Sequence, residues 1–129
     1  MRFFSSSLYS QILNAKRVLR EQRFNIKLPA EEFTSDVERK KALVGEEILV
    51  QGVVDCVFWN DDGEIVLVDY KTDGFSSKLS PKEVKERLTE RYKDQLYYYL
   101  LALERIFPNT KKRAAIYSFY LGEHFYLDI

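Results

Sequence analysis

The chain has 129 residues, 46% of them hydrophobic, and its twenty basic residues balance twenty acidic ones. This length and hydrophobic content predict one folded domain and exclude a disordered segment. A net charge of zero neither favours nor excludes a nucleic-acid partner, so only local patches of charge could indicate one. The single cysteine, Cys56, excludes an internal disulfide and an iron–sulfur cluster held by this chain alone, which fits a cytoplasmic protein. No apolar run is long enough to span a bilayer, so we expect no membrane association.

The predicted elements alternate between helices and strands in a way typical of an α/β domain. In chain order they are a short amphipathic helix that begins at residues 5–7, a strand over 18–28 that ends at Pro29, a loop or short surface helix over 30–41, a strand over 48–59, a turn at 60–63, a strand over 64–71, a long helix over 81–107, and strands over 114–121 and 124–127. The long helix has a capping sequence, with Ser80 at its N-cap and Glu83 three residues later. Because a helix of that length permits a crossover, we predict a mixed central β-sheet flanked by helices.

An apolar strand near the middle of the chain ends in charged residues. Residues 66–73 read VLVDYKTD, so Asp69, Lys71 and Asp73 follow the apolar run with no turn residue between them. A buried charge destabilises a fold by several kcal/mol unless it is paired or holds a metal ion. The end of this strand is therefore a candidate site, and the alternative is an ion cluster at the surface of a hairpin.

The turn at residues 60–63 decides which side chains share a face of the hairpin. A two-residue loop would place Asp55 opposite Val68 and direct Asp69 to the other side of the sheet. The sequence Asn-Asp-Asp-Gly instead favours a type I turn followed by Gly63 in the left-handed conformation. We therefore predict the three-residue form of the turn.

With the three-residue turn, Asp55 lies opposite Asp69 and Val53 lies opposite Lys71. Asp55, Asp69 and Lys71 then share one face, with the Cβ atoms of opposite residues about 5 Å apart. Two carboxylates at that separation repel each other unless a cation or a proton lies between them. Gly52, three residues before Asp55, leaves room for a ligand to approach.

The spacing of these residues resembles a known nuclease family. Gly52-x-x-Asp55, thirteen further residues and then Asp69-Tyr70-Lys71 are similar to the core of the PD-(D/E)XK nuclease superfamily, and Gln95-x-x-x-Tyr99 is similar to its RecB-type branch. The wider context, from residue 18 to the end, resembles the nuclease module of bacterial helicase–nuclease subunits that resect double-strand breaks. The resemblance implies a restriction-endonuclease-like fold and a DNA substrate. It also implies that residues 1–129 are a single domain, a C-terminal part of a longer helicase–nuclease.

The resemblance also implies a role for each residue of this set. Asp55 and Asp69 would bind Mg²⁺, or Mn²⁺, through carboxylate oxygens, and the backbone carbonyl of Tyr70 would be a further ligand. Lys71 would orient the attacking water or help to deprotonate it, and would stabilise the charge that builds on the phosphate. The metal would lower the pKa of that water and polarise the phosphodiester.

Further residues belong to the predicted site. Gln95 and Tyr99 lie one helical turn apart and share a face, so they would hold the site or the DNA strand. The alternative for Tyr99 is core packing. Glu21 would supply a further catalytic acid from an earlier strand, and its alternative is a surface glutamate. Asp73 would pair with Lys71 or cap the following loop.

One departure from the RecB-type pattern concerns the metal site. Members of that branch usually carry a histidine ligand upstream of the hairpin, whereas the single histidine here, His124, matches no motif. We therefore expect weak metal binding and low activity from this domain alone. The expected partners are DNA, single-stranded and delivered by a helicase, and a second subunit of the helicase–nuclease complex. The alternatives are a catalytically silent module that binds DNA or a partner, and a stand-alone nuclease of the phage or CRISPR-associated type.

Basic residues gather at 39–41, along the long helix and at 111–113, where they could contact phosphates. Each group is interleaved with acids or lies at the end of an element, so we interpret most of them as solvated surface. Arg91, one helical turn before Gln95, is the exception. The tyrosines at 97–99 could stack on the bases of a single strand.

Overall fold

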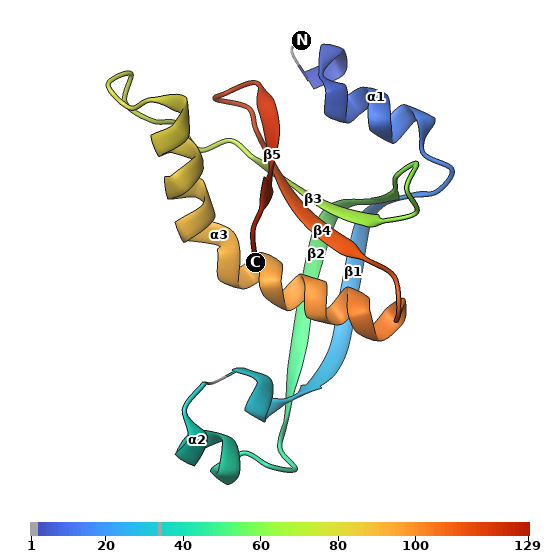
Figure 1. The fold of residues 1–129 in the computed structure, drawn as a ribbon, viewed down its shortest axis with the longest axis vertical. Helices are drawn as coiled ribbons and strands as arrows, with labels where there is room; N and C mark the ends of the chain where they lie inside the picture. Colours follow the sequence, from blue (N-terminus) through green and yellow to red (C-terminus); the bar gives the residue numbers. More distant parts are fainter. Residues whose placement is uncertain (1–2, 34) are drawn as a thin grey trace.

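The computed structural model describes residues 3–33 and 35–129, which form a mixed five-stranded sheet with helices on both faces (Figure 1). The strand order is β1-β2-β3-β4-β5. The elements are η1 (Phe3–Ser5), α1 (Ser7–Asn14), β1 (Val18–Pro29), η2 (Ala30–Phe33), α2 (Val37–Ala42), β2 (Glu47–Trp59), β3 (Ile65–Lys71), α3 (Pro81–Ile106), β4 (Lys112–Ser118) and β5 (Glu123–Leu127). The α/β class and the mixed sheet predicted from the sequence are confirmed.

The helix α3 provides the predicted crossover, because it connects the parallel neighbours β3 and β4. The other neighbouring strands of the sheet are antiparallel. A complete capping box starts α3: the Ser80 hydroxyl accepts from the backbone N–H of Glu83, and the Glu83 carboxylate accepts from that of Ser80. Neither α3 nor any other helix in the described part of the chain is long and apolar enough to cross a membrane.

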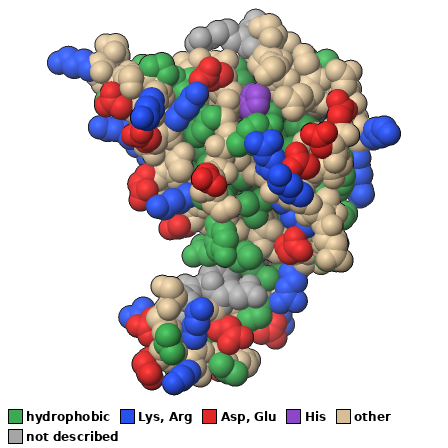
Figure 2. Space-filling view, viewed as in Figure 1, with side chains coloured by type: hydrophobic (Ala, Val, Ile, Leu, Met, Phe, Trp, Pro, Cys, Tyr) green, Lys and Arg blue, Asp and Glu red, His purple; other side chains and the backbone are tan. Residues whose placement is uncertain are grey.

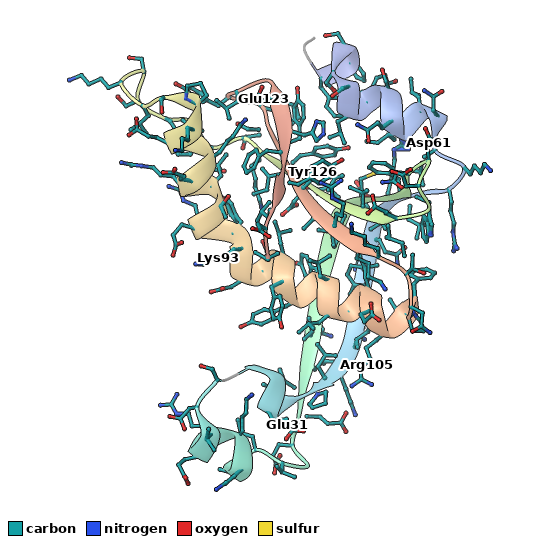
Figure 3. The ribbon with its side chains drawn as sticks, in the orientation of Figure 1. Glu31, Asp61, Lys93, Arg105, Glu123 and Tyr126 are labelled. Carbon is teal, nitrogen blue, oxygen red and sulfur yellow. The ribbon has the colours of Figure 1, made fainter. Side chains whose placement is uncertain are left out.

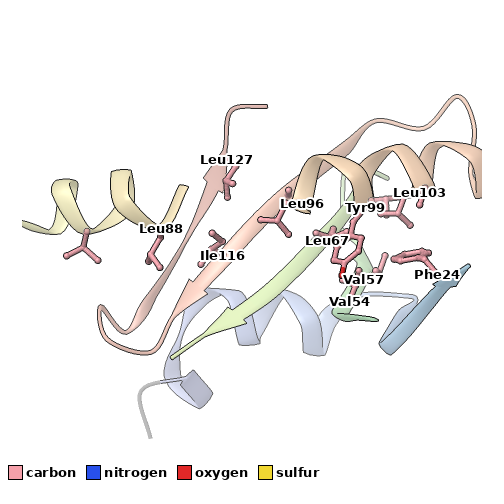
Figure 4. Packing of buried hydrophobic residues seen from close by; sticks show 14 residues of the cluster. Phe24, Val54, Val57, Leu67, Leu88, Leu96, Tyr99, Leu103, Ile116 and Leu127 are labelled. Atoms are coloured by element: carbon pink, nitrogen blue, oxygen red, sulfur yellow. The ribbon is translucent and has the colours of Figure 1, made fainter. Parts of the chain in front are cut away.

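Two apolar clusters hold the helices against the sheet. The larger cluster lies between α3 and the sheet and contains Val57, Leu67 and Leu96 (Figure 4). The smaller cluster lies on the opposite face, where Leu8 and Ile12 of α1 pack on the strands. Each fully buried side chain of this size stabilises the fold by about 1.5–3 kcal/mol relative to an exposed one. The two clusters therefore fix the central strands from both sides.

The strands β1 and β2 continue beyond the rest of the sheet as a two-stranded arm that carries η2 and α2 at its tip (Figures 1 and 2). β2 pairs with β1 over residues 47–58 but with β3 only over 56–59. Charged side chains of both signs cover the tip (Figure 2). We call the described residues between 22 and 54 the arm, and the rest of the described chain the body.

The ladder between β1 and β2 is regular except at Glu21 and Asp55, which do not pair. Glu21 has a φ of 50°, in the left-handed region that strand residues rarely adopt. Side chains normally alternate between the faces of a strand. Here Val54 and Val57 both pack in the α3 cluster although they are three residues apart. The alternation therefore shifts by one residue at Asp55, where the arm leaves the body.

Candidate active site

The turn between β2 and β3 has the three-residue form that its sequence predicts. Gly63 adopts a φ of 76°, and the backbone N–H of Asn60 donates to the carbonyl of Glu64 at 3.0 Å. The Asn60 side chain also accepts from the backbone N–H of Glu64 at 2.9 Å. The ladder that follows has the predicted register, which by continued counting aligns Asp55 with Asp69.

The backbone ladder between β2 and β3 ends one pair before Asp55. A side-chain contact continues it, because Oδ2 of Asp55 accepts from the backbone N–H of Tyr70 at 2.8 Å. Beyond this point β2 follows β1 into the arm, while β3 stays beside β4. The predicted pairing of Val53 with Lys71 is therefore wrong, and Val53 is exposed on the arm. Asp55 lies at the fork between the arm and the body.

Asp69 is buried at the end of β3, with only 6% of its surface exposed. Burial raises the pKa of Asp69 to about 6, and a side-chain hydrogen bond with Asp55 acts in the same direction. The Lys71 ammonium lies 3.0 Å from Oδ2 of Asp69 and opposes that rise. Two acids this close in a buried position are stable only with a proton or a cation between them. The structure thus brings Asp55, Asp69 and Lys71 together.

Tyr70 directs its ring away from the two acids. The ring packs on the opposite face of the sheet, where its centroid lies 5.3 Å from that of Phe3 and 6.3 Å from that of Tyr117. Its N–H points at Asp55. The N–H and the carbonyl of one strand residue point to the same side, so the Tyr70 carbonyl also faces the fork. The next carbonyl, that of Lys71, turns the other way and accepts from the N–H of a residue beyond β4.

The groups at the fork fit a hard divalent cation. Asp55 and Asp69 offer carboxylate oxygens and Tyr70 offers a carbonyl oxygen, which are the ligands that Mg²⁺ and Mn²⁺ prefer. The buried Asp69 is the observation in favour of a cation, because a positive ion would offset the repulsion between the acids. Within the described residues, no group of three or more His, Cys, Asp or Glu side chains is arranged to hold a metal. A cation here would therefore depend on backbone oxygen and water as well.

Tyr92 of α3, which the sequence did not mark as a site residue, contacts Lys71. The Lys71 ammonium lies over the Tyr92 ring, 4.0 Å from its centroid. The Tyr92 hydroxyl donates to the Asp73 carboxylate, at 3.0 and 2.9 Å from its two oxygens, and Arg91 forms an ion pair with the same carboxylate. Asp73 therefore pairs with α3, and the predicted pairing with Lys71 is wrong. In the sequence, Tyr92 is indistinguishable from the other residues of the apolar stripe of α3.

Tyr99 is a core residue, with 7% of its surface exposed and its ring centroid 6.0 Å from that of Phe24. A Cβ at position 52 would lie 2.3 Å from the Tyr99 hydroxyl. Gly52 therefore makes room for Tyr99, and not for a ligand as the sequence suggested. Nε2 of the exposed Gln95 donates to the Tyr99 hydroxyl at 3.3 Å, so the two residues share a face as predicted.

Glu21 and His124 lie outside this group. Glu21 stands across from Asp55 in β1, but it is exposed, and within the described residues no hydrogen bond or ion pair joins it to Asp55. His124 is paired with Tyr117 in the ladder between β4 and β5. Residues paired in this way share a face. Tyr117 packs with α1, so His124 faces away from the acid pair and does not replace the missing histidine ligand.

Most of the basic residues that could contact phosphates have acidic neighbours, as predicted for a solvated surface. The ion pairs are Lys41–Glu38, Lys85–Glu123, Lys93–Glu90, Lys111–Glu64 and Lys112–Glu104. Lys93 points outward from α3 (Figure 3). Of the three tyrosines at 97–99, Tyr97 is 43% exposed and could stack on a base, whereas Tyr99 is buried.

Comparison with known proteins defines the class of this protein. The sequence pattern of the PD-(D/E)XK nuclease superfamily matches residues 4–126. The chain therefore belongs to the PD-(D/E)XK nuclease superfamily, as the spacing of Asp55, Asp69 and Lys71 suggested.

The chain is also similar to named helicase–nuclease proteins. It is 46% identical over 121 residues to the ATP-dependent helicase/nuclease AddA of Acetivibrio thermocellus, in an alignment that covers 94% of this chain and 9% of that protein. The proteins of the same name from Bacillus mycoides and Bacillus cereus strain AH820 are 43% identical over 124 residues, which covers 95% of this chain and 10% of each relative. The chain thus spans about a tenth of the length of these relatives.

Proposed function

We propose that this chain is a metal-dependent DNA nuclease module of the AddA type. The observation that carries the proposal is the meeting of Asp55 and Asp69 at the fork, with the Lys71 ammonium beside Asp69. Membership of a nuclease superfamily and the names of the relatives support it. We expect Mg²⁺ as the cofactor, with Mn²⁺ as a substitute.

Each residue at the fork would have a separate task in hydrolysis. Asp55, Asp69 and the Tyr70 carbonyl would hold the cation. When bound, the cation would lower the pKa of a water molecule and polarise the phosphodiester. Lys71, a compact charge with three donors, would orient that water and stabilise the negative charge that develops on the phosphate. Asp69 must be ionised for this, so its raised pKa favours activity above about pH 6.

Gln95 and Tyr99 would support the DNA strand beside the fork. The Gln95 side chain is exposed and anchored on the Tyr99 hydroxyl, so its remaining polar atoms are available to a nucleotide. Tyr99 would act mainly by fixing Gln95 and filling the space above Gly52. Glu21 remains a candidate outer acid, because it stands across from Asp55 in β1.

We further propose that the module acts within a longer bacterial cytoplasmic protein. The chain spans about a tenth of the relatives' length, and their name joins a helicase to a nuclease. A helicase would use ATP and deliver single strands to the fork, and an AddB-type protein would be the partner. The biological process would be resection of double-strand breaks and recombinational repair.

The test is cleavage of labelled single-stranded DNA by the chain in Mn²⁺ or Mg²⁺, combined with calorimetric titration of Mn²⁺. Asp69→Ala should abolish both Mn²⁺ binding and cleavage, whereas Lys71→Ala should abolish cleavage and leave Mn²⁺ binding. Asp61→Ala is the matched control, because Asp61 is exposed at the far end of the same hairpin (Figure 3).

Two outcomes would separate this proposal from its alternatives. Cleavage that survives Asp69→Ala would contradict the proposed site. Wild-type protein that binds DNA but shows no Mn²⁺ binding dependent on Asp55 and Asp69 would favour a catalytically silent binding module. A wild type that binds Mn²⁺ at Asp55 and Asp69 but cleaves nothing alone would be compared with a full-length relative that carries the same substitutions.

A further inference from the structure

We propose that Tyr92, held in place by Asp73 and Arg91, is a positioning residue that keeps the Lys71 ammonium at Asp69. The inference rests on the proposed function for its consequence in catalysis, although the contact itself can be tested without any cleavage assay. It assigns a role to Asp73, Arg91 and Tyr92, which come from the segment after β3 and the first half of α3.

The Lys71 ammonium has two neighbours of different kinds. It lies 3.0 Å from Oδ2 of Asp69 and 4.0 Å from the centroid of the Tyr92 ring. The negative face of an aromatic ring attracts an ammonium without accepting a proton or a directed hydrogen bond. The ring therefore limits where the ammonium can lie but leaves its N–H donors free for Asp69, a water or a phosphate. The Lys71 side chain is only 18% exposed, which confines it further.

The second half of the device controls Asp73. Lys71 lies between two acids in the sequence, Asp69 and Asp73, each two residues away. An unengaged Asp73 carboxylate would compete with Asp69 for the ammonium. In the structure the Tyr92 hydroxyl lies 3.0 and 2.9 Å from the two oxygens of Asp73, and Arg91 forms an ion pair with it. Both contacts direct Asp73 toward α3 and leave Lys71 to Asp69.

One tyrosine thus performs two tasks with two parts of its side chain. The hydroxyl engages the competing acid, and the ring faces the ammonium. Tyr92 also packs at the edge of the α3 cluster, so its own position is fixed by the core. Arg91 lies beside the Phe75 ring, with 5.7 Å from its Cζ to the ring centroid, which restrains the other partner of Asp73.

The test separates the ring from the hydroxyl with two variants. Tyr92→Phe keeps the ring and removes the contact with Asp73, whereas Tyr92→Leu removes both and keeps an apolar side chain for the core. Tyr97→Leu is the matched control, because Tyr97 lies on the same helix and is 43% exposed. The circular dichroism spectrum and thermal midpoint of each variant establish that it is folded.

The first readout is the NMR chemical shift of the Lys71 ε-methylene protons, assigned from their loss in Lys71→Arg. An ammonium over a ring face places these protons in the upfield zone of the ring current. We expect the upfield shift in the wild type and in Tyr97→Leu, a reduced shift in Tyr92→Phe, and a random-coil position in Tyr92→Leu. Asp73→Asn should change it less than Tyr92→Leu does. An ε-methylene shift that is the same in Tyr92→Leu and in the wild type would overturn the proposal.

The second readout is cleavage of single-stranded DNA at saturating Mn²⁺. Tyr92→Leu should lower kcat about tenfold to a hundredfold, as loss of a residue that orients a site residue commonly does. KM for DNA and the affinity for Mn²⁺ should stay near the wild-type values, which a general loss of structure would not allow. Tyr92→Phe should fall between the two, and an unchanged kcat in Tyr92→Leu would overturn the catalytic part.

The two readouts distinguish the failure of this inference from the failure of the proposed function. If no variant and not even the wild type cleaves DNA, the proposed nuclease activity of the chain fails. The shift of the Lys71 protons still decides whether Tyr92 positions Lys71. If Tyr92→Leu does not fold, the comparison of Tyr92→Phe with the wild type decides it instead.

Discussion

The arm and the body share two strands but differ in what supports those strands. In the body, β1 and β2 lie beside β3 and are covered by α3 on one face and α1 on the other. In the arm they have mainly each other, and Val44, Leu49 and Val53 remain exposed. A two-stranded ribbon by itself is at best marginally stable in water. The arm is therefore the part of low local stability, and the body is the rigid frame.

The candidate active site lies where these two regions separate. Asp69 and Lys71 come from β3 in the body, and Asp55 comes from β2 at the position where the arm begins. The divergence of the strands leaves the Tyr70 backbone without a ladder partner on that side, so Asp55 can reach it. The comparison shows how a sheet can expose backbone oxygen next to two acids: one strand leaves the sheet at the position of an acid.

The largest effect should separate the two regions directly. Leu67 is fully buried in the body, whereas Leu49 on the arm is 49% exposed. Leu67→Ala should lower the free energy of unfolding by about 2–5 kcal/mol, because it removes buried surface and leaves a cavity. Leu49→Ala should change it by about 0.5 kcal/mol or less. Urea denaturation of both variants measures the difference, and equal losses would contradict the division into body and arm.

The next effect concerns the acid at the fork. The pKa of Asp69 in the fold is about 6, above its ordinary 3.8, so the folded state binds this proton more tightly than the unfolded state. This contribution to stability is fully present below pH 3.8 and is lost as the pH rises through about 6. Above that pH, metal-free wild type carries a buried charge that Asp69→Asn removes. At pH 7.5 in chelator, Asp69→Asn should be more stable by up to about 3 kcal/mol.

The sign of this effect should reverse with metal. The gain from Asp69→Asn should shrink toward pH 4, and Mn²⁺ should raise the thermal midpoint of the wild type but not of Asp69→Asn. Asp61→Asn at the exposed turn is the control and should respond to neither change. An Asp69→Asn variant less stable than metal-free wild type at pH 7.5 would show that Asp69 stabilises the fold as an ionised group.

A third prediction concerns the contact between the arm and α3. A Cβ at Gly52 would lie 2.3 Å from the Tyr99 hydroxyl and 2.5 Å from a ring carbon, so something must shift. Gly52→Ala should therefore cost about 1–3 kcal/mol of stability by overpacking. In the Tyr99→Leu background the same substitution should cost less, and a double-mutant cycle measures the difference. Additive losses would show that the two residues do not constrain each other.

The smallest effect compares the two helix caps. Ser80 caps α3 in the body through Glu83, and Asp36 caps α2 on the arm by accepting from the backbone N–H of Arg39 at 3.0 Å. Removal of a cap costs about 1 kcal/mol in the helix that it ends. Ser80→Ala should lower global stability by about that amount. Asp36→Ala should lower only the hydrogen-exchange protection of α2, because α2 can unfold without the body.

Much of the fold and of the site could be predicted from short-range features. The capping box at Ser80, the turn at residues 60–63 and the alternation of β3 each act through contacts within a few residues. For the same reason the register of the hairpin, and with it the approach of Asp55 to Asp69, followed from the chemistry of Asn60 and Gly63. The spacing of acids and lysine identified the superfamily that the comparison then established.

Tertiary structure alone decided the features that join distant segments. Asp73 and Tyr92 are nineteen residues apart, and their contact depends on how α3 packs across the sheet. The space at Gly52 belongs to Tyr99 for the same reason. The separation of β2 from β3 after Asp55 reflects which strand finds a longer partner, which no local pattern records. By itself the sequence determined which residues carry charge and which way they face in each strand. Packing between elements determined which of those charges meet.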